Sequence, residues 1–271
     1  HPQLFNCQTT EVLPKRSYMF RIQHRFGKVG FDESFYKQFL GLDLPANIRL
    51  GFSIAVTKNL FLGFGRTKVD KVWDFEGKYA VLKQTKDNQM PISFSVYGNL
   101  GISSKDAPQA DSTLFFADST SLFEPKFAHR ITYNLQLILA RKFGRIASVQ
   151  IAPSFVYRNL SAPGHTNYTF ALPVSGRIRI GLKSYIVLEY AYVFNNRTKD
   201  FRDPFSLGVE IGTLGHAFQF MITSTDNLLD QDIFTRSSFD ITKGEFVLGF
   251  NITRKFWIKK RKGKKRKRKK E

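Results

Sequence analysis

The sequence predicts an all-β protein, a single 12-stranded antiparallel transmembrane β-barrel with both termini in the periplasm. Short segments in which every second residue is apolar recur about a dozen times, with turn residues between them. In residues 46–54 one face carries Ile48, Leu50, Phe52 and Ile54, because side chains alternate across a strand. The apolar sets are rich in aromatic residues, and the opposite sets hold Arg, Glu, Asn, Ser and Gly. This pattern is typical of a closed barrel with lipid outside and a polar interior.

Composition supports a wall that faces lipid. The 271 residues include 28 Phe and 10 Tyr, and aromatic side chains on the outer face of successive strands need a non-aqueous surface. The sequence has no run of ~18 consecutive apolar residues, which a membrane-spanning helix would need. Cys7 is the sole cysteine, so an intramolecular disulfide is excluded.

Twelve strands are predicted, and most of them have the ~9–11 residues or slightly more that a tilted strand needs to cross a bilayer. In chain order they cover residues 16–26, 46–55, 58–67, 71–83, 91–101, 126–142, 146–159, 168–181, 184–194, 205–212, 215–224 and 244–257. An even number of strands places both termini on the same side. Pro153 and Pro173 fall inside the seventh and eighth strands, where we expect either a local bulge or a strand boundary, because proline cannot donate to a strand ladder.

The connections between these strands give independent support. Every second connection is short, with residues 84–90 as a longer exception, whereas the long ones include 27–45, 102–125, 195–204 and 225–243. Outer-membrane barrels have short periplasmic turns and longer outer loops. The alternation therefore predicts a periplasmic N-terminus. Residues 34–40 have mixed spacing that predicts a short helix in the first outer loop.

The chain divides into three parts. Residues 1–14 are expected to be a periplasmic N-terminal extension, 15–257 the transmembrane barrel, and 258–271 a disordered basic tail. The tail cations are Lys259, Lys260, Arg261, Lys262, Lys264, Lys265, Arg266, Lys267, Arg268, Lys269 and Lys270, within a chain of net charge +20. No signal peptide is visible, and we interpret the chain as a mature exported product.

Alternation also predicts which charged side chains face the barrel interior. The cations are Arg21, Arg25, Arg49, Lys78, Arg130, Arg158, Arg177 and Arg179, and the anions are Asp74, Glu76, Glu189 and Glu210. Arg177 and Arg179 are expected to reach Glu189 on the neighbouring strand. Two interpretations stay open: an interior cross-linked by ion pairs and closed to solutes, and a narrow hydrated channel whose surplus of cations favours anions. A folded-in 102–125 loop could fill the space in the first case.

The sequence contains no convincing catalytic or metal-binding constellation. His24 and His216 fall on the outward face, but no outward Ser with a neighbouring acid or amide pairs with either, so we expect no enzyme activity. The five His residues and the cysteine lack metal-ligand spacing. No cofactor is predicted.

Several segments resemble an uncharacterised family of predicted β-barrel proteins from Bacteroidota. The resemblance rests on RIQHRFG (21–27), residues 39–71, residues 140–160, residues 205–225 and FVLGFNITRKF (246–256). It implies an outer-membrane location and supplies no known activity or catalytic residues. The closing residues of the last strand, up to Trp257, also resemble the aromatic-terminated assembly signal of outer-membrane proteins.

Two Asp-Ser-Thr triplets in the third outer loop resemble the O-glycosylation acceptor used by this phylum. Ser112 and Ser119 are the residues that would carry the modification.

Two functions follow as hypotheses. The first is a non-enzymatic outer-membrane barrel that conducts small, preferably anionic, solutes. The second is a plugged accessory or anchoring subunit whose basic tail binds a periplasmic partner. The expected partners are outer-membrane lipid and other outer-membrane or periplasmic proteins, reached through the wall, the loops or the tail. Nucleic acid is not expected as a partner.

Overall fold

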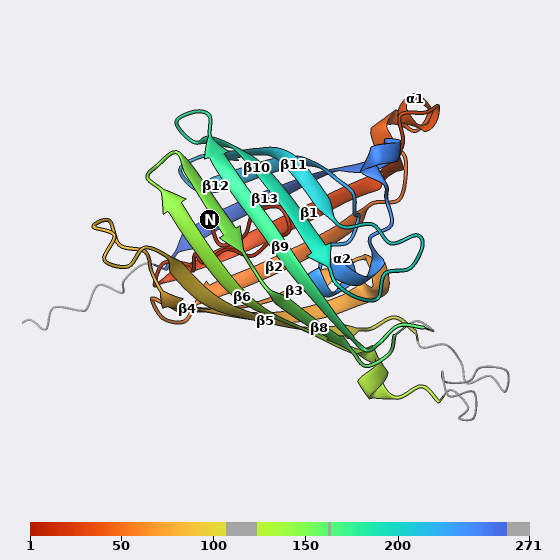
Figure 1. Ribbon diagram of the computed structural model, residues 1–271, viewed down its shortest axis with the longest axis horizontal. Coiled ribbons are helices and arrows are strands. Elements are labelled where there is room, and N and C mark those ends of the chain that lie inside the picture. Colours follow the sequence, from red (N-terminus) through yellow and green to blue (C-terminus); the bar gives the residue numbers. More distant parts are fainter. Residues whose placement is uncertain (107–123, 162–163, 259–271) are drawn as a thin grey trace, which may run out of the picture.

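The computed structural model describes residues 1–106, 124–161 and 164–258, and its strands form one sheet (Figure 1). The strands, in chain order, are β1 (Ser17–Val29), β2 (Asn47–Ala55), β3 (Leu60–Thr67), β4 (Val72–Leu82), β5 (Ser93–Ser103), β6 (Ile131–Phe143), β7 (Ala147–Ile151), β8 (Ser154–Arg158), β9 (Tyr168–Arg179), β10 (Ser184–Val193), β11 (Phe205–Gly212), β12 (His216–Thr223) and β13 (Phe246–Trp257). Their order and lengths follow the alternating segments of the sequence.

The sheet closes into an antiparallel barrel. Apart from β7 and β8, each strand pairs with its neighbours in the chain, and β1 pairs with both β2 and β13, which joins the first strand to the last. The short strands β7 and β8 both pair with β6 and β9, so they occupy one position in the wall. Counted this way, the described residues form a closed barrel of twelve strand positions, and the predicted fold is confirmed.

The two prolines have different consequences for the wall. Pro153 lies in the gap between β7 and β8, where the strand is interrupted, while its carbonyl still accepts a hydrogen bond from the Leu137 amide at 3.0 Å. Pro173 stays within β9 opposite Ala191, and its carbonyl accepts from the Ala152 amide at 2.9 Å. A break therefore occurs at the first proline, and the second is tolerated because only its acceptor is used.

The outer face of the wall is apolar. Phe52, Phe64 and Phe75 face one another across β2, β3 and β4, and the last two remain 47% and 50% exposed. Exposed side chains of this size recur on every side of the barrel. A surface of this kind is stable only against hydrocarbon.

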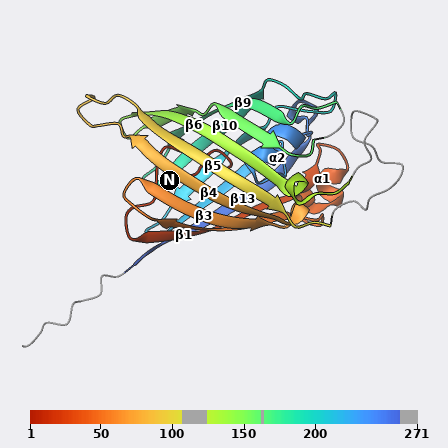
Figure 2. The ribbon, with the colours of Figure 1, turned by 90° about the horizontal axis from the view of Figure 1, so that it is seen from below.

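The helices are short and gather at one end of the barrel. They are α1 (Ser34–Lys37), α2 (Asp230–Arg236), η1 (Phe39–Gly41), η2 (Val69–Lys71), η3 (Phe127–Arg130) and η4 (Ile241–Lys243). Figures 1 and 2 both place α1 and α2 at the end that carries the long loops, and the chain begins within the other half. The helix α1 agrees with the one predicted in the first outer loop. Among the described residues, no helix is long and apolar enough to cross a bilayer.

Candidate functional site: the closed barrel interior

The first residues of the chain lie inside the barrel. Residues 2–10 are all buried, and an isolated bridge between Gln3 and Gln8 folds them back on themselves. The sequence predicts a periplasmic extension over residues 1–14, whereas in the structure residues 2–10 of this segment lie in the interior and Pro14 is exposed. The segment 2–14 is called the strap below.

The strap supplies most of the hydrogen-bond acceptors for two buried cations. The Lys78 ammonium group donates to the carbonyls of Pro2 at 2.5 Å and Thr9 at 2.9 Å, and to Gln8 Oε1 at 3.0 Å. The Arg21 guanidinium donates to the carbonyls of three further strap residues and to a single wall side chain, Gln219, at 3.2 Å. Backbone oxygens therefore replace water around these charges.

Two more charged wall residues contact the strap. The Arg25 guanidinium donates to Asn6 Oδ1 at 2.8 Å and to Asn251 Oδ1 at 3.0 Å. The Glu189 carboxylate accepts from the amides of Asn6 and Cys7, at 3.0 to 3.2 Å. Among the described residues, no carboxylate lies within 4.0 Å of Lys78, Arg21 or Arg25.

Arg49 is bound differently, within the wall itself. Its guanidinium donates to both Asp74 carboxylate oxygens, at 2.9 and 2.5 Å, and both residues are almost fully buried. A Cβ atom on Gly51 or Gly65 would lie within 2.8 Å of this guanidinium, so glycine at these positions provides its space. The wall can therefore pair its own charges without help from the strap.

The other half of the interior is filled by the connection between β12 and β13. This folded-in loop (224–245) carries α2 into the barrel, and Arg158 donates to Asp232 Oδ1 at 2.9 Å. Asn134 donates to Asp230 Oδ2 at 3.0 Å, and Gln231 donates to Asn99 Oδ1 at 2.9 Å. The sequence suggests residues 102–125 as a filling segment, but residues 107–123 lie outside the described residues, and the filling segment that the structure describes is 224–245.

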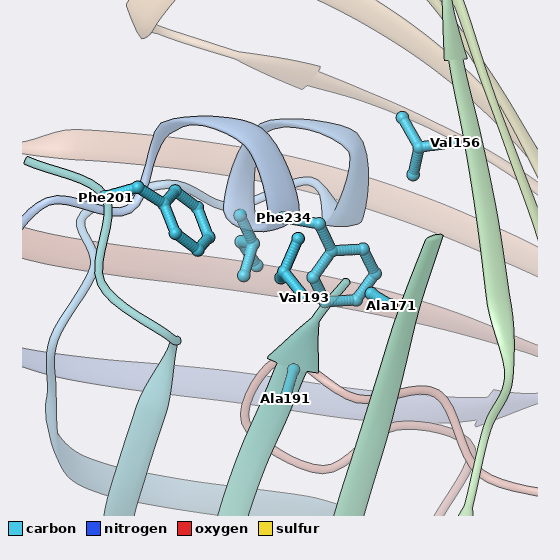
Figure 3. Close-up of a cluster of buried hydrophobic side chains, with 7 residues drawn as sticks. Val156, Ala171, Ala191, Val193, Phe201 and Phe234 are labelled. Atoms are coloured by element: carbon cyan, nitrogen blue, oxygen red, sulfur yellow. The ribbon is translucent and has the colours of Figure 1, made fainter. Parts of the chain in front are cut away.

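The interior wall has an apolar seat for α2, shown in Figure 3. Ile233 and Phe234 of α2 and Phe201 of a neighbouring loop pack against the wall residues Val156, Ala171, Ala191 and Val193. These wall residues fall on inward positions of β8, β9 and β10. Burial of their apolar surface holds the helix in the barrel.

The strap and the folded-in loop meet near the middle of the barrel. A cavity of only about 10 Å³ remains between them, lined by strap residues such as Asn6, loop residues such as Leu229, and wall residues such as Glu76. This volume is close to the minimum that a single water needs. Larger cavities lie toward the two ends, of about 240 Å³ beside Arg158 and about 380 Å³ beside Arg177.

Most of the predicted interior charges are buried in the structure, and the others lie at the rims of the barrel. Those almost fully buried are Arg21, Arg25, Arg49, Asp74, Glu76, Lys78, Glu189 and Glu210. Arg158 and Arg177 are partly buried. Glu76 accepts hydrogen bonds from Ser53 and Tyr97.

Three expected placements need correction. Arg177 pairs with Glu210 at 3.0 Å rather than with Glu189, whose carboxylate faces the strap. The Arg179 guanidinium turns back to the carbonyls of Gly181 and Leu182 in the β9–β10 turn. Arg130 belongs to η3 at the mouth, before β6 begins, and its guanidinium donates to loop carbonyls.

The remaining predicted sites cannot be placed. Ser112, Ser119 and the basic tail from residue 259 onward lie outside the described residues. Among the described residues, no group of three or more His, Cys, Asp or Glu side chains could hold a metal ion. His24 stacks on Phe250, and His216 stacks on Phe218.

Sequence reasoning missed the residues that close the interior. Gln3, Asn6, Gln8 and Asp230 carry much of the closure, yet none belongs to an alternating segment. A weak signal was present, since residues 1–10 contain amide and hydroxyl side chains but no Lys, Arg, Asp or Glu. Such a segment can fill a polar interior without burying further charge.

A family comparison covers nearly the whole described chain. The family described as "Membrane bound beta barrel domain (DUF5777)" matches residues 1–256. The chain belongs to this family. The match includes the strap and ends before the basic tail, and it agrees with the outer-membrane location. No curated protein matches the chain.

Solved structures with a similar fold are outer-membrane porins and channels. The COG4313 outer membrane channel from Pseudomonas putida F1 has 11% identity and a TM-score of 0.56, with 91% of this chain and 98% of that chain covered. The NanC porin has 7% identity and a TM-score of 0.54, over 89% and 100%. The KdgM porin has 9% identity and a TM-score of 0.52, over 89% and 99%. At these identities the likeness establishes the fold, and the protein is an outer-membrane β-barrel.

Proposed function

We propose that the protein is a non-enzymatic, gated outer-membrane channel for small anionic solutes, closed in this structure by its strap together with the folded-in loop. The observation that carries the proposal is the position of Lys78, a fully buried cation whose hydrogen-bond acceptors all belong to the strap. Burial of an unpaired charge is costly, and a permanently filled interior would be better served by an apolar side chain at this position.

The buried Arg49–Asp74 pair can be compared with the surroundings of Lys78. It represents the arrangement expected of a charge that only supports the wall, because both partners belong to strands. Lys78, Arg21 and Arg25 instead have no wall carboxylate within 4.0 Å among the described residues. The positive charges of these three residues would act on solutes once the strap has left the interior.

Withdrawal of the strap would change the charge that faces the interior. Lys78 would lose all its hydrogen-bond acceptors, Arg21 most of them and Arg25 one, whereas Glu189 is the carboxylate that would lose strap amides. Three cations and one anion would become hydrated together. An interior in which the newly hydrated charges are mostly cationic favours anions over cations.

The proposal is tested by deletion of residues 2–10, alone and combined with Phe234→Ala to release the folded-in loop, and by conductance measurements in planar bilayers. We expect discrete conductance steps with anion preference from the deleted protein, and few or none from the full chain. Within the deleted protein, Lys78→Met should reduce the anion preference measured as a reversal potential.

Lys83→Met is the matched control. Lys83 follows the same strand but is exposed and donates to turn residues, so its replacement should leave the reversal potential unchanged. Heat-dependent electrophoretic migration verifies that each variant is a folded barrel. A folded protein that lacks the strap, carries Phe234→Ala and still stays silent would refute the channel.

A second candidate, the plugged anchoring subunit, is favoured by the apolar attachment of the strap. Leu4 and Phe5 are buried against Val187 and Met221, in addition to the polar contacts. In this case the basic tail would bind a periplasmic partner. Bilayers would be silent with and without the strap, and deletion of residues 259–271 would remove a protein that otherwise co-purifies.

A further inference from the structure

The mouth of the barrel on the side of the short turns contains a basic cavity that the proposed channel function does not require. It has a volume of about 280 Å³ and lies between the β6–β7 turn and the β9–β10 turn. Its described lining includes Lys142, Arg145, Arg177 and Arg179, with Ser148 and Tyr185, and no Asp or Glu. Four cations around one cavity without a lining acid are electrostatically unfavourable unless an anion is present.

Two of these cations are partly neutralised from neighbouring positions. Lys142 forms an ion pair with Glu11 of the strap, and Arg177 pairs with Glu210 at 3.0 Å. Both carboxylates line adjacent cavities rather than this one. The Arg177 guanidinium also lies over the Tyr185 ring, 4.2 Å from its centroid, which fixes its plane.

The other two cations have no acidic partner in the described chain. Arg179 donates through Nε and Nη2 to turn carbonyls at 2.7 and 3.0 Å, which orients its guanidinium and leaves further N–H groups free. The exposed Arg145 side chain has no hydrogen-bond or ion-pair partner among the described residues. One oriented and one adaptable guanidinium suit a multidentate oxyanion.

We propose that this cavity is a binding site for a soluble, small phosphate-type oxyanion. The size supports a small ligand, because pockets for drug-sized molecules begin at about 300 Å³. A soluble source is favoured over a lipid headgroup because Lys142, Arg177 and Arg179 occupy inward positions. Lys142 and Arg177 both lie opposite Ser148, and Arg179 lies opposite Tyr185. Their apolar neighbours Val149 and Ile178 point to lipid, with 48% and 56% exposure.

The test is calorimetric titration of the full, detergent-solubilised chain with pyrophosphate at low ionic strength. We expect saturable binding that weakens about tenfold or more in the Arg145→Gln, Arg179→Gln double variant, since charged hydrogen bonds to the ligand are lost. Arg145 lies in an exposed turn, so the single variant Arg145→Gln keeps the test valid if the double variant fails to fold. It should also weaken binding.

Arg141→Gln is the matched control. Arg141 precedes Lys142 on β6 but occupies an outward position opposite Val149, so the same charge is removed from the other face of the wall. Equal weakening by this variant, or no weakening by the double variant, would overturn the proposal. Displacement of pyrophosphate by monomeric short-chain phosphatidylglycerol would assign the site to a lipid headgroup and overturn the soluble ligand. Pyrophosphate binding does not require the strap to leave the interior. The channel proposal and the binding-site proposal can therefore be refuted independently.

Discussion

Lys78 is a charged residue whose surroundings are completed by a segment about 70 residues away in the chain. Its ammonium group has three oxygen acceptors, two of them backbone carbonyls, and lies over the Phe61 ring at 5.0 Å. A strand position with Lys on the inner face is therefore compatible with a filled barrel only because the strap brings oxygen atoms to it. The sign of the charge can be read from the sequence, but its partner cannot.

The buried position of Asp230 predicts that the packing of the folded-in loop in the barrel depends on pH. Burial raises the pKa of this loop carboxyl to about 7, with further contributions from the nearby carboxylates of Glu189 and Glu76. A released loop would titrate near the ordinary value of 3.8, so the packed loop keeps a proton that the released loop gives up between these values. Packing is therefore strongest at low pH and weakens as the pH rises toward 7.

We expect the amides of residues 228–237 to open about a hundredfold more often at pH 8 than at pH 5, because about two pKa units separate pH 5 from the packed-state pKa of about 7 and each unit is about 1.4 kcal/mol. Hydrogen exchange, corrected for the intrinsic rate, measures this ratio. Asp230→Asn should abolish it. Asp240→Asn is the control, because the Thr242 and Arg202 hydrogen bonds lower the pKa of Asp240 to about 2, so it stays ionised throughout. An unchanged ratio in Asp230→Asn would contradict the assignment.

At the scale of the element, α2 shows how a short helix is held without a helix cap. Its seven residues have no side-chain hydrogen bond at the N-cap Leu229, and four of the seven are buried. An isolated helix of this length is unstable in water. Its conformation therefore depends on the apolar seat formed by β8, β9 and β10.

Phe234→Ala tests this dependence. Removal of a buried phenylalanine costs about 3–5 kcal/mol, which is enough to release α2 while the wall stays closed. We expect faster proteolysis within 224–245 and unchanged heat-dependent migration of the barrel. Phe127→Ala, at a position 67% exposed at the same mouth, should leave the cleavage rate unchanged. Equal protection of residues 224–245 from proteolysis in both variants would show that polar contacts are enough to hold α2 in the barrel.

At the scale of the whole molecule, hydrocarbon is the partner of the outer wall. The inner wall meets the strap and the folded-in loop, so both faces of the sheet are covered when the barrel is in lipid. This arrangement explains why an outward Phe can be half exposed in the isolated chain and still be stable.

Phe64→Arg tests the lipid contact. A cation near the middle of the lipid-facing wall should lower the free energy of unfolding by about 2–4 kcal/mol in lipid vesicles. Urea titration followed by tryptophan fluorescence gives this value. Leu182→Arg, in a turn where the side chain is 88% exposed, should change it little. Similar losses in both variants would contradict a lipid-facing position for Phe64.

The barrel can be predicted from the amino-acid pattern alone, because strand alternation has a period of two residues and is visible within each segment. The sequence placed Lys78 inward, and it marked Pro153 and Pro173 as irregular positions, of which the first lies at the gap between β7 and β8. Only the tertiary structure decided that the interior is closed. The strap and α2 have no periodicity of their own, and their positions depend on contacts such as Asn6 with Glu189, which are 183 residues apart in the chain. The local sequence pattern therefore specifies the wall. The positions of the strap and the folded-in loop depend instead on contacts with inner-wall side chains, which come together only after the wall has closed.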